Sequence, residues 1–161
     1  MNKMKLKLIS AGVFAGCVLG IIAMRVARAT PQQGAVTTIL TGGPISLGEI
    51  SVHSIVDPGH KLKIQTQGVS DIYVVRNVIP PGGDTGWHST PGPSIISVVA
   101  GEGTAYAADN PKGVVFTAGT AFTAPCAQTH IFRNEGTVDL ELIAFQVNPE
   151  GAPRQIDEPA P

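Results

Sequence analysis

Short runs of apolar and β-branched residues alternate with clusters of Gly, Pro, Asn and Asp from residue 36 to residue 147. Runs of this length, separated by turn residues every ten or so positions, predict the strands of a β-sandwich or barrel. No segment of the region keeps a helical period free of Gly and Pro. The predicted strands span residues 36–40, 50–55, 62–66, 72–79, 95–99, 104–107, 114–117, 121–123, 129–133 and 138–147. The pattern therefore predicts an all-β fold.

The last predicted strand, 138–147, changes its pattern halfway. Up to Leu142 the apolar residues occupy one parity, while Asp139 and Glu141 occupy the other, which indicates one solvated face. Beyond Leu142 both parities are apolar. We therefore expect the second half to be buried on both sides, either by a second sheet or by a partner subunit.

The chain has 161 residues, 14% of them charged, and a net charge of −1. Five of its 11 basic residues precede residue 30, where there is no acidic residue, so the remainder holds six basic and 12 acidic residues. Its net charge is then −6, which excludes a nucleic-acid-binding protein because such a protein needs a basic face. A hydrophobic content of 43% argues against disorder, and the length suggests one domain.

The N-terminus has the composition of an export signal. Lys3, Lys5 and Lys7 precede an uncharged, mostly apolar run over residues 8–24, and Ala-Arg-Ala ends at Ala29. This order predicts a signal peptide over residues 1–29, cleaved after Ala29, and a periplasmic or secreted protein. An uncleaved membrane anchor is the alternative for the same run, and it would be the only contact with a membrane. Lipid attachment at Cys17 is a third.

The exported domain then spans residues 30–161, with N-terminal strands within 36–66, a core over about 69–148 and a Pro-rich C-terminal tail. Its one cysteine, Cys126, cannot form an internal disulfide. Free cysteine is among the most buried residue types, so we interpret Cys126 as a small buried apolar residue.

Two segments, 82–101 and 119–134, each place a histidine where a strand begins after a Gly/Pro turn. Because side chains alternate along a strand, Thr90 shares a face with His88, and Gln128 shares a face with His130. Alternate side chains of a closed barrel point inward. The two imidazoles are therefore expected to meet inside the barrel.

The same two segments resemble the two conserved motifs of the cupin superfamily. The spacing of the first motif is matched by Gly82, His88 and Gly101, and that of the second by Gly119, Pro125, His130 and Asn134. The resemblance implies a cupin-type jelly-roll β-barrel (a double-stranded β-helix), often dimeric, with a central pocket. Members commonly hold a metal in that pocket, through four side chains of these motifs.

The chain departs from the family pattern at three positions. Thr90 stands where the family has a second His, Ser94 where it has Glu, and Ala127 where the second motif has Gly. Only His88 and His130 remain of the four implied ligands. A stable transition-metal site normally needs three or four N, O or S ligands. The amide oxygen of Gln128 or the thiolate of Cys126 could add one.

Three interpretations of the histidine pair stay open. The pair binds a divalent metal (Mn, Fe, Zn or Ni) weakly, with Gln128, water or substrate completing the site. It lines a metal-free pocket, with Thr90 and Gln128 beside it, where the imidazoles bind a small polar or anionic ligand or serve as acid–base groups near neutral pH. Or the two histidines are only hydrogen-bonded inside the barrel.

The sequence thus predicts an exported cupin-domain protein that binds a small molecule around His88 and His130. The alternatives are a metal-dependent oxidoreductase of the dioxygenase type, and a non-catalytic structural or partner-binding barrel. Because cupins are often dimeric, the resemblance also implies that a homodimer can form.

Other polar and aromatic residues have simpler interpretations. Trp87 is expected to pack in the core or an interface, and Asp84 to stabilise a turn. His53 and His60 are expected at the surface, and Arg133 to pair there.

Overall fold

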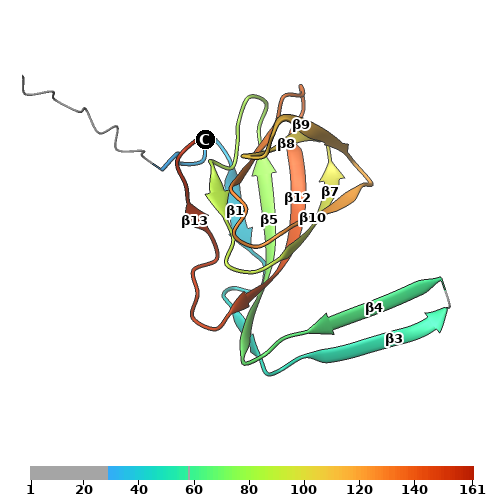
Figure 1. Cartoon of the computed structure of the whole chain (residues 1–161). Helices are drawn as coiled ribbons and strands as arrows, with labels where there is room; N and C mark the ends of the chain where they lie inside the picture. The colour runs from blue at the N-terminus through green and yellow to red at the C-terminus, as the bar shows by residue number, and fades with distance from the viewer. Residues whose placement is uncertain (1–28, 58) are drawn as a thin grey trace, which may run out of the picture.

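In the computed structural model, described over residues 29–57 and 59–161, two β-sheets face each other around one core (Figure 1). The larger sheet has the order β1-β5-β12-β7-β10, with β2 also paired to β5. The smaller has the order β13-β6-β11-β8-β9. The strands of the larger sheet are β1 (Val36–Ile39), β2 (Ile45–Leu47), β5 (Ser70–Ile79), β7 (Ser94–Ala100), β10 (Ala121–Ala124) and β12 (Leu140–Pro149). Those of the smaller are β6 (His88–Ser89), β8 (Glu102–Ala107), β9 (Asn110–Thr117), β11 (His130–Arg133) and β13 (Ile156–Asp157).

The centre of the larger sheet is the antiparallel pair β5–β12, in register from Leu140 opposite Ile79 to Pro149 opposite Ser70. Alternation along β12 turns Leu140, Leu142 and Ala144 toward the smaller sheet, where they are buried. These residues belong to the core cluster, which also contains Val75, Ile79, Ile96, Val98 and Phe132. The predicted all-β jelly-roll barrel is therefore confirmed.

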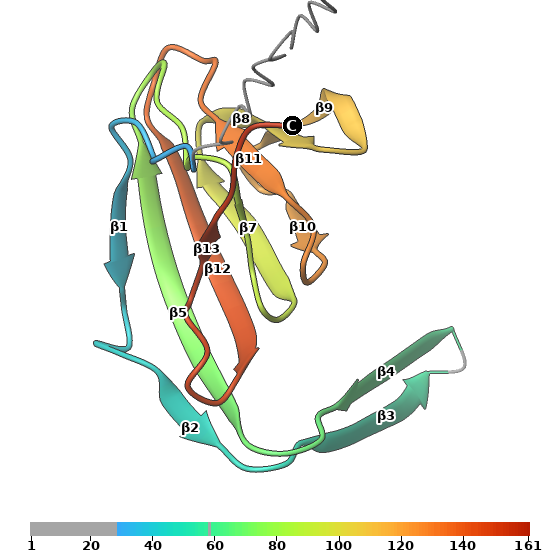
Figure 2. The same cartoon turned by 60° about the vertical axis from the view of Figure 1, so that its left-hand side comes forward.

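Each strand predicted from the pattern corresponds to an observed strand, with boundaries that differ by a few residues. The pattern missed β2, β6 and β13, because runs of two or three residues are too short to show alternation. Part of the C-terminal tail, predicted only as Pro-rich, is thus the strand β13 (Figure 2), which pairs with β6.

The expected burial of the end of β12 on both sides is wrong within the chain. Phe145 is 40% exposed, and its neighbour Ile95 on β7 is 52% exposed. Only the face of β12 that points toward the smaller sheet is buried. Gln146 and Asn148 continue that buried face beyond Ala144. Cover by a partner subunit stays a prediction.

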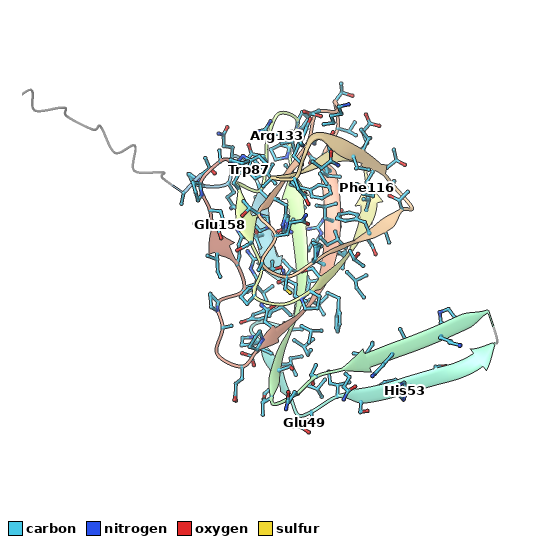
Figure 3. All side chains as sticks on the ribbon, in the orientation of Figure 1. Glu49, His53, Trp87, Phe116, Arg133 and Glu158 are labelled. Carbon is cyan, nitrogen blue, oxygen red and sulfur yellow. The ribbon has the colours of Figure 1, made fainter. Side chains whose placement is uncertain are left out.

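A hairpin of β3 (Ser51–Asp57) and β4 (His60–Gln65) projects from the barrel (Figures 1 and 2). His53 lies on this hairpin, away from the barrel (Figure 3), and both His53 and His60 are exposed. Neither histidine therefore contributes to the barrel interior, as the sequence predicted.

The predicted signal segment lies outside the described residues except for Ala29. Within residues 29–57 and 59–161, no helix has the length and apolar character needed to cross a membrane.

Candidate functional site

His88 on β6 and His130 on β11 lie directly opposite each other in an antiparallel register. Their ring centroids are 4.4 Å apart and the ring planes are inclined by 59°. Each residue is 8% exposed. The structure thus brings together two histidines that are 42 positions apart in the chain, as expected from the two motifs.

A tight loop before β6 fixes the ring of His88. Asp84 Oδ1 accepts a hydrogen bond from the Gly86 amide at 2.8 Å, and the Gly86 carbonyl lies 2.9 Å from His88 Nδ1. Gly86 has a φ of +68°, and a Cβ at this position would overlap the carbonyl oxygen of Thr30. Only glycine satisfies both conditions without strain.

His130 is held in the same way. Its Nδ1 lies 2.7 Å from the backbone carbonyl of Gln128. A carbonyl oxygen can only accept, so in both neutral histidines Nδ1 carries the hydrogen and donates it. Each Nε2 consequently keeps a lone pair with no hydrogen on it, and the site has two imidazole acceptors side by side.

Burial keeps both imidazoles neutral at neutral pH. It lowers the pKa of His88 from 6.5 to about 4, and the nearby His130 and the charge of Arg154 act in the same direction. Burial also lowers the pKa of His130. Removing a cationic imidazole from water is unfavourable, so the acceptor form is the stable one in this site.

Both histidines line a small cavity of about 40 Å³ between the two sheets. One buried water needs about 10–15 Å³ of such space, so the cavity holds a group of only a few heavy atoms. Its polar lining includes Thr90 and Ser94, which are buried. The Thr90 hydroxyl donates to the Gly92 carbonyl at 2.8 Å, so it has no hydrogen left for a ligand.

The sequence analysis missed several residues that line this cavity, among them Gln146 and Arg154. Gln146 on β12 is 4% exposed; its amide nitrogen is 3.3 Å from Ser94 Oγ, while its Oε1 is buried and has no hydrogen-bond partner among the described residues. Arg154, from the tail, lines the same cavity. The parity of Gln146 with Leu142 and Ala144 could have placed it inside. No sequence signal places Arg154 there.

A second cavity of about 290 Å³ adjoins the same residues. His130 and Phe132 line both cavities. The second is walled by Phe116 and Phe122, whose rings stack at 4.2 Å, and Phe122 also stacks on Phe132 at 4.9 Å. A small polar chamber therefore lies beside a larger one with aromatic walls.

The side chain of Gln128 is not part of the polar chamber, contrary to expectation. Its amide nitrogen donates to both carboxylate oxygens of Asp109, at 2.9 and 3.0 Å. The Gln128 side chain lines only the aromatic-walled cavity. What this residue gives to the polar site is its backbone carbonyl, which orients His130.

The interpretation of Cys126 as a buried residue is wrong. Its free thiol is exposed, together with its neighbours Pro125 and Ala127. These residues form a turn outside the core, so the small size and apolar character of a cysteine are not used for packing. In this position Cys126 gives no ligand to the histidine pair.

The remaining predicted residues lie outside the chamber. Trp87 is buried and Asp84 is a turn residue, as expected. The guanidinium of Arg133 lies 5.3 Å above the ring of Tyr106, a cation–π contact at the surface.

The donor set does not fit a tightly held catalytic metal. Among the described residues, no group of three or more His, Cys, Asp and Glu side chains is placed to hold a metal ion. Two imidazole nitrogens fall short of the three protein ligands of a catalytic zinc site. The guanidinium of Arg154 in the same cavity also opposes a divalent cation.

Comparison with known proteins agrees with the fold. Residues 75–145 match the family model described as a cupin domain. No curated protein matches the chain. Similar solved structures include a polyketide cyclase from Streptomyces resistomycificus, with 13% identity, a TM-score of 0.55, and cover of 81% of this chain and 75% of that one.

Two further similar structures are an uncharacterised double-stranded β-helix protein from Klebsiella pneumoniae and a predicted oxalate decarboxylase from Thermotoga maritima. The first has 20% identity, a TM-score of 0.47, and cover of 69% of this chain and 85% of that one. The second has 25% identity, a TM-score of 0.43, and cover of 51% and 83%.

Proposed function

The chain carries a cupin domain over residues 75–145, and from that premise we propose that it is an exported protein that binds a small molecule around His88 and His130. The observation that carries the proposal is the pair of facing imidazoles that line one small cavity. Each has its Nδ1 bonded to a backbone carbonyl and its Nε2 free. Groups fixed in this way are preorganised to bind a ligand.

The chemistry of the cavity favours a polar ligand. Two neutral Nε2 atoms can only accept hydrogen bonds, so the ligand must offer O–H or N–H donors to them. A purely structural role does not account for this arrangement. The two Nδ1 atoms are hydrogen-bonded, but each Nε2 is left without a donor among the described residues, which is unfavourable for a buried polar atom.

The test is a screen of small polar compounds by thermal shift, followed by NMR of the imidazole nitrogens. We expect compounds that raise the melting temperature also to move the Nε2 resonances of His88 and His130, since binding to the folded state stabilises it. His88→Ala and His130→Ala should each abolish the shift. The exposed His53→Ala is the matched control and should keep it. Shifts that survive both cavity variants, or a screen with no effect on the imidazoles, would overturn the proposal.

The metal-dependent oxidoreductase is the second candidate, because two adjacent bare Nε2 atoms are metal-binding groups. Mn, Fe, Zn and Ni added one at a time to protein treated with a chelator should give only small melting-temperature shifts. A metal retained stoichiometrically through purification and lost in His130→Ala would favour the oxidoreductase over metal-free binding.

A further inference from the structure

Arg154 has no carboxylate within ion-pair distance among the described residues, although the charge of Asp157 acts on it from farther away. The single ion pair within the described residues joins Arg76 and Glu141. Arg154 is half-buried, donates to the Gln155 side-chain amide oxygen at 2.8 Å, and lies close enough to act on His88. A guanidinium drawn partly out of water with no ion-paired carboxylate is unfavourable, and a bound anion would relieve that.

The same cavity also offers groups that accept hydrogen bonds. It contains the two bare Nε2 atoms, and Oε1 of Gln146 is buried with no partner among the described residues. A plain carboxylate would satisfy Arg154 but would offer nothing to these three acceptors. The ligand therefore needs an anionic group and a hydrogen-bond donor close together.

The sizes of the two cavities limit the rest of the ligand. About 40 Å³ holds a carboxylate with an adjacent hydroxyl and little else. The space next to it is the cavity of about 290 Å³ walled by Phe116 and Phe122, which shares His130 and Phe132 with the small cavity and would take the rest of a larger ligand. Aromatic walls favour an apolar substituent there.

We infer that the ligand is a small α-hydroxycarboxylic acid with an apolar substituent, an inference that rests on the proposed function. Its carboxylate pairs with Arg154, its hydroxyl donates to the histidine pair or to Gln146, and its substituent packs against Phe132. The C-terminal tail thus supplies a specificity residue to a site whose histidines and Gln146 come from the barrel strands.

The test compares four probes on the intact domain: mandelate, mandelamide without the charge, phenylacetate without the hydroxyl, and lactate without the ring. Mandelate should bind at least about tenfold more tightly than mandelamide, since charge-assisted hydrogen bonds are the strong ones. Phenylacetate and lactate should bind several-fold more weakly than mandelate. Imidazole NMR shifts report that binding is at the histidine pair.

Arg154→Gln should weaken mandelate at least about tenfold and leave mandelamide unchanged. Arg133→Gln removes the same charge from a surface position and is the matched control, with no expected change. Because the four probes are also compared on the unaltered protein, the inference stays testable if Arg154→Gln fails to fold.

Mandelamide binding as tightly as mandelate, or mandelate binding unaffected by Arg154→Gln, would overturn the hydroxy-acid inference while leaving small-molecule binding intact. Imidazole resonances unmoved by any of the four probes would overturn it as well. The compound screen decides separately whether the pocket binds any small molecule.

Discussion

The loops that lead into the two histidines differ in how they are built. Residues 83–90, before and through β6, are almost all buried, whereas residues 125–127, before β11, are exposed. The first loop is bonded to the N-terminal segment through Gln33 and to β11 through Phe132. The second makes one backbone bond across to Thr90. His88 is thus positioned by a densely packed loop, and the neighbouring His130 by the local backbone conformation of an exposed loop.

The glycines show the same contrast. At Gly86 a side chain is excluded by both φ and the Thr30 carbonyl. In the second loop Ala127 occupies the position where the cupin motif has glycine, and its φ is +58°. Ala127 keeps the left-handed backbone conformation that glycine would adopt more easily, at a conformational cost of roughly 1 kcal/mol.

The largest predicted effect tests the packed loop. Gly86→Ala should lower the free energy of unfolding by about 3 kcal/mol, because it adds overlap with the Thr30 carbonyl to an unfavourable φ. Gly119 also has a positive φ, +85°, but has open space around it. Gly119→Ala should therefore lower the free energy of unfolding by only about 1 kcal/mol. Urea unfolding of both variants measures the difference, and equal losses would contradict the steric argument.

The next effect is the pH dependence of stability. His88 has a pKa of about 4 in the folded chain and an ordinary value of 6.5, so between these values the unfolded chain binds a proton that the folded chain does not. The free energy of unfolding should therefore fall as the pH drops from 6.5 to 4, by on the order of 3 kcal/mol from His88, and the His88 contribution should level off below.

Urea unfolding at pH 7, 6 and 5 measures this dependence. His88→Gln should remove the part of the pH dependence that comes from His88. The difference in the free energy of unfolding between the variant and the unaltered protein should therefore narrow toward pH 5. A gap that stays constant over this range would show that His88 is not held neutral. The exposed His53→Gln is the control.

The smallest effect tests the exposed loop. Ala127→Gly should raise the free energy of unfolding by about 0.5–1 kcal/mol, because relief of the left-handed φ exceeds the added freedom of the unfolded chain. Thermal unfolding measures it. A loss of stability instead would mean that Ala127 contributes packing that outweighs its backbone strain.

Much of the fold was predictable because alternation and turn residues are local signals. The histidine pair was predictable because two spaced motifs fix two strands. Gln146 and Arg154 were not found, for different reasons. Gln146 is a polar residue on the buried face of β12. The apolar Phe145 beside it suggested that both faces of this strand end are buried, whereas Phe145 is exposed. Arg154 reaches the cavity through the path of the tail, which no local pattern specifies.

Gln128 shows the limit of parity arguments. It shares a parity with His130 but precedes the first residue of β11, so the alternation of the strand does not yet apply to its side chain. Its amide is free to turn to Asp109, which no short-range pattern links to it.

The close approach of Thr30 to Gly86 has a practical consequence for handling the protein. Gln33 pairs with Asp84 through two backbone bonds of 2.9 and 3.0 Å, so the first residues of the domain brace the loop that orients His88. A truncation that begins after Gln33 would remove that brace, and a bulky affinity tag fused directly before Thr30 would crowd it. Recombinant versions intended for ligand work should therefore keep residues 30–33 and place any tag elsewhere.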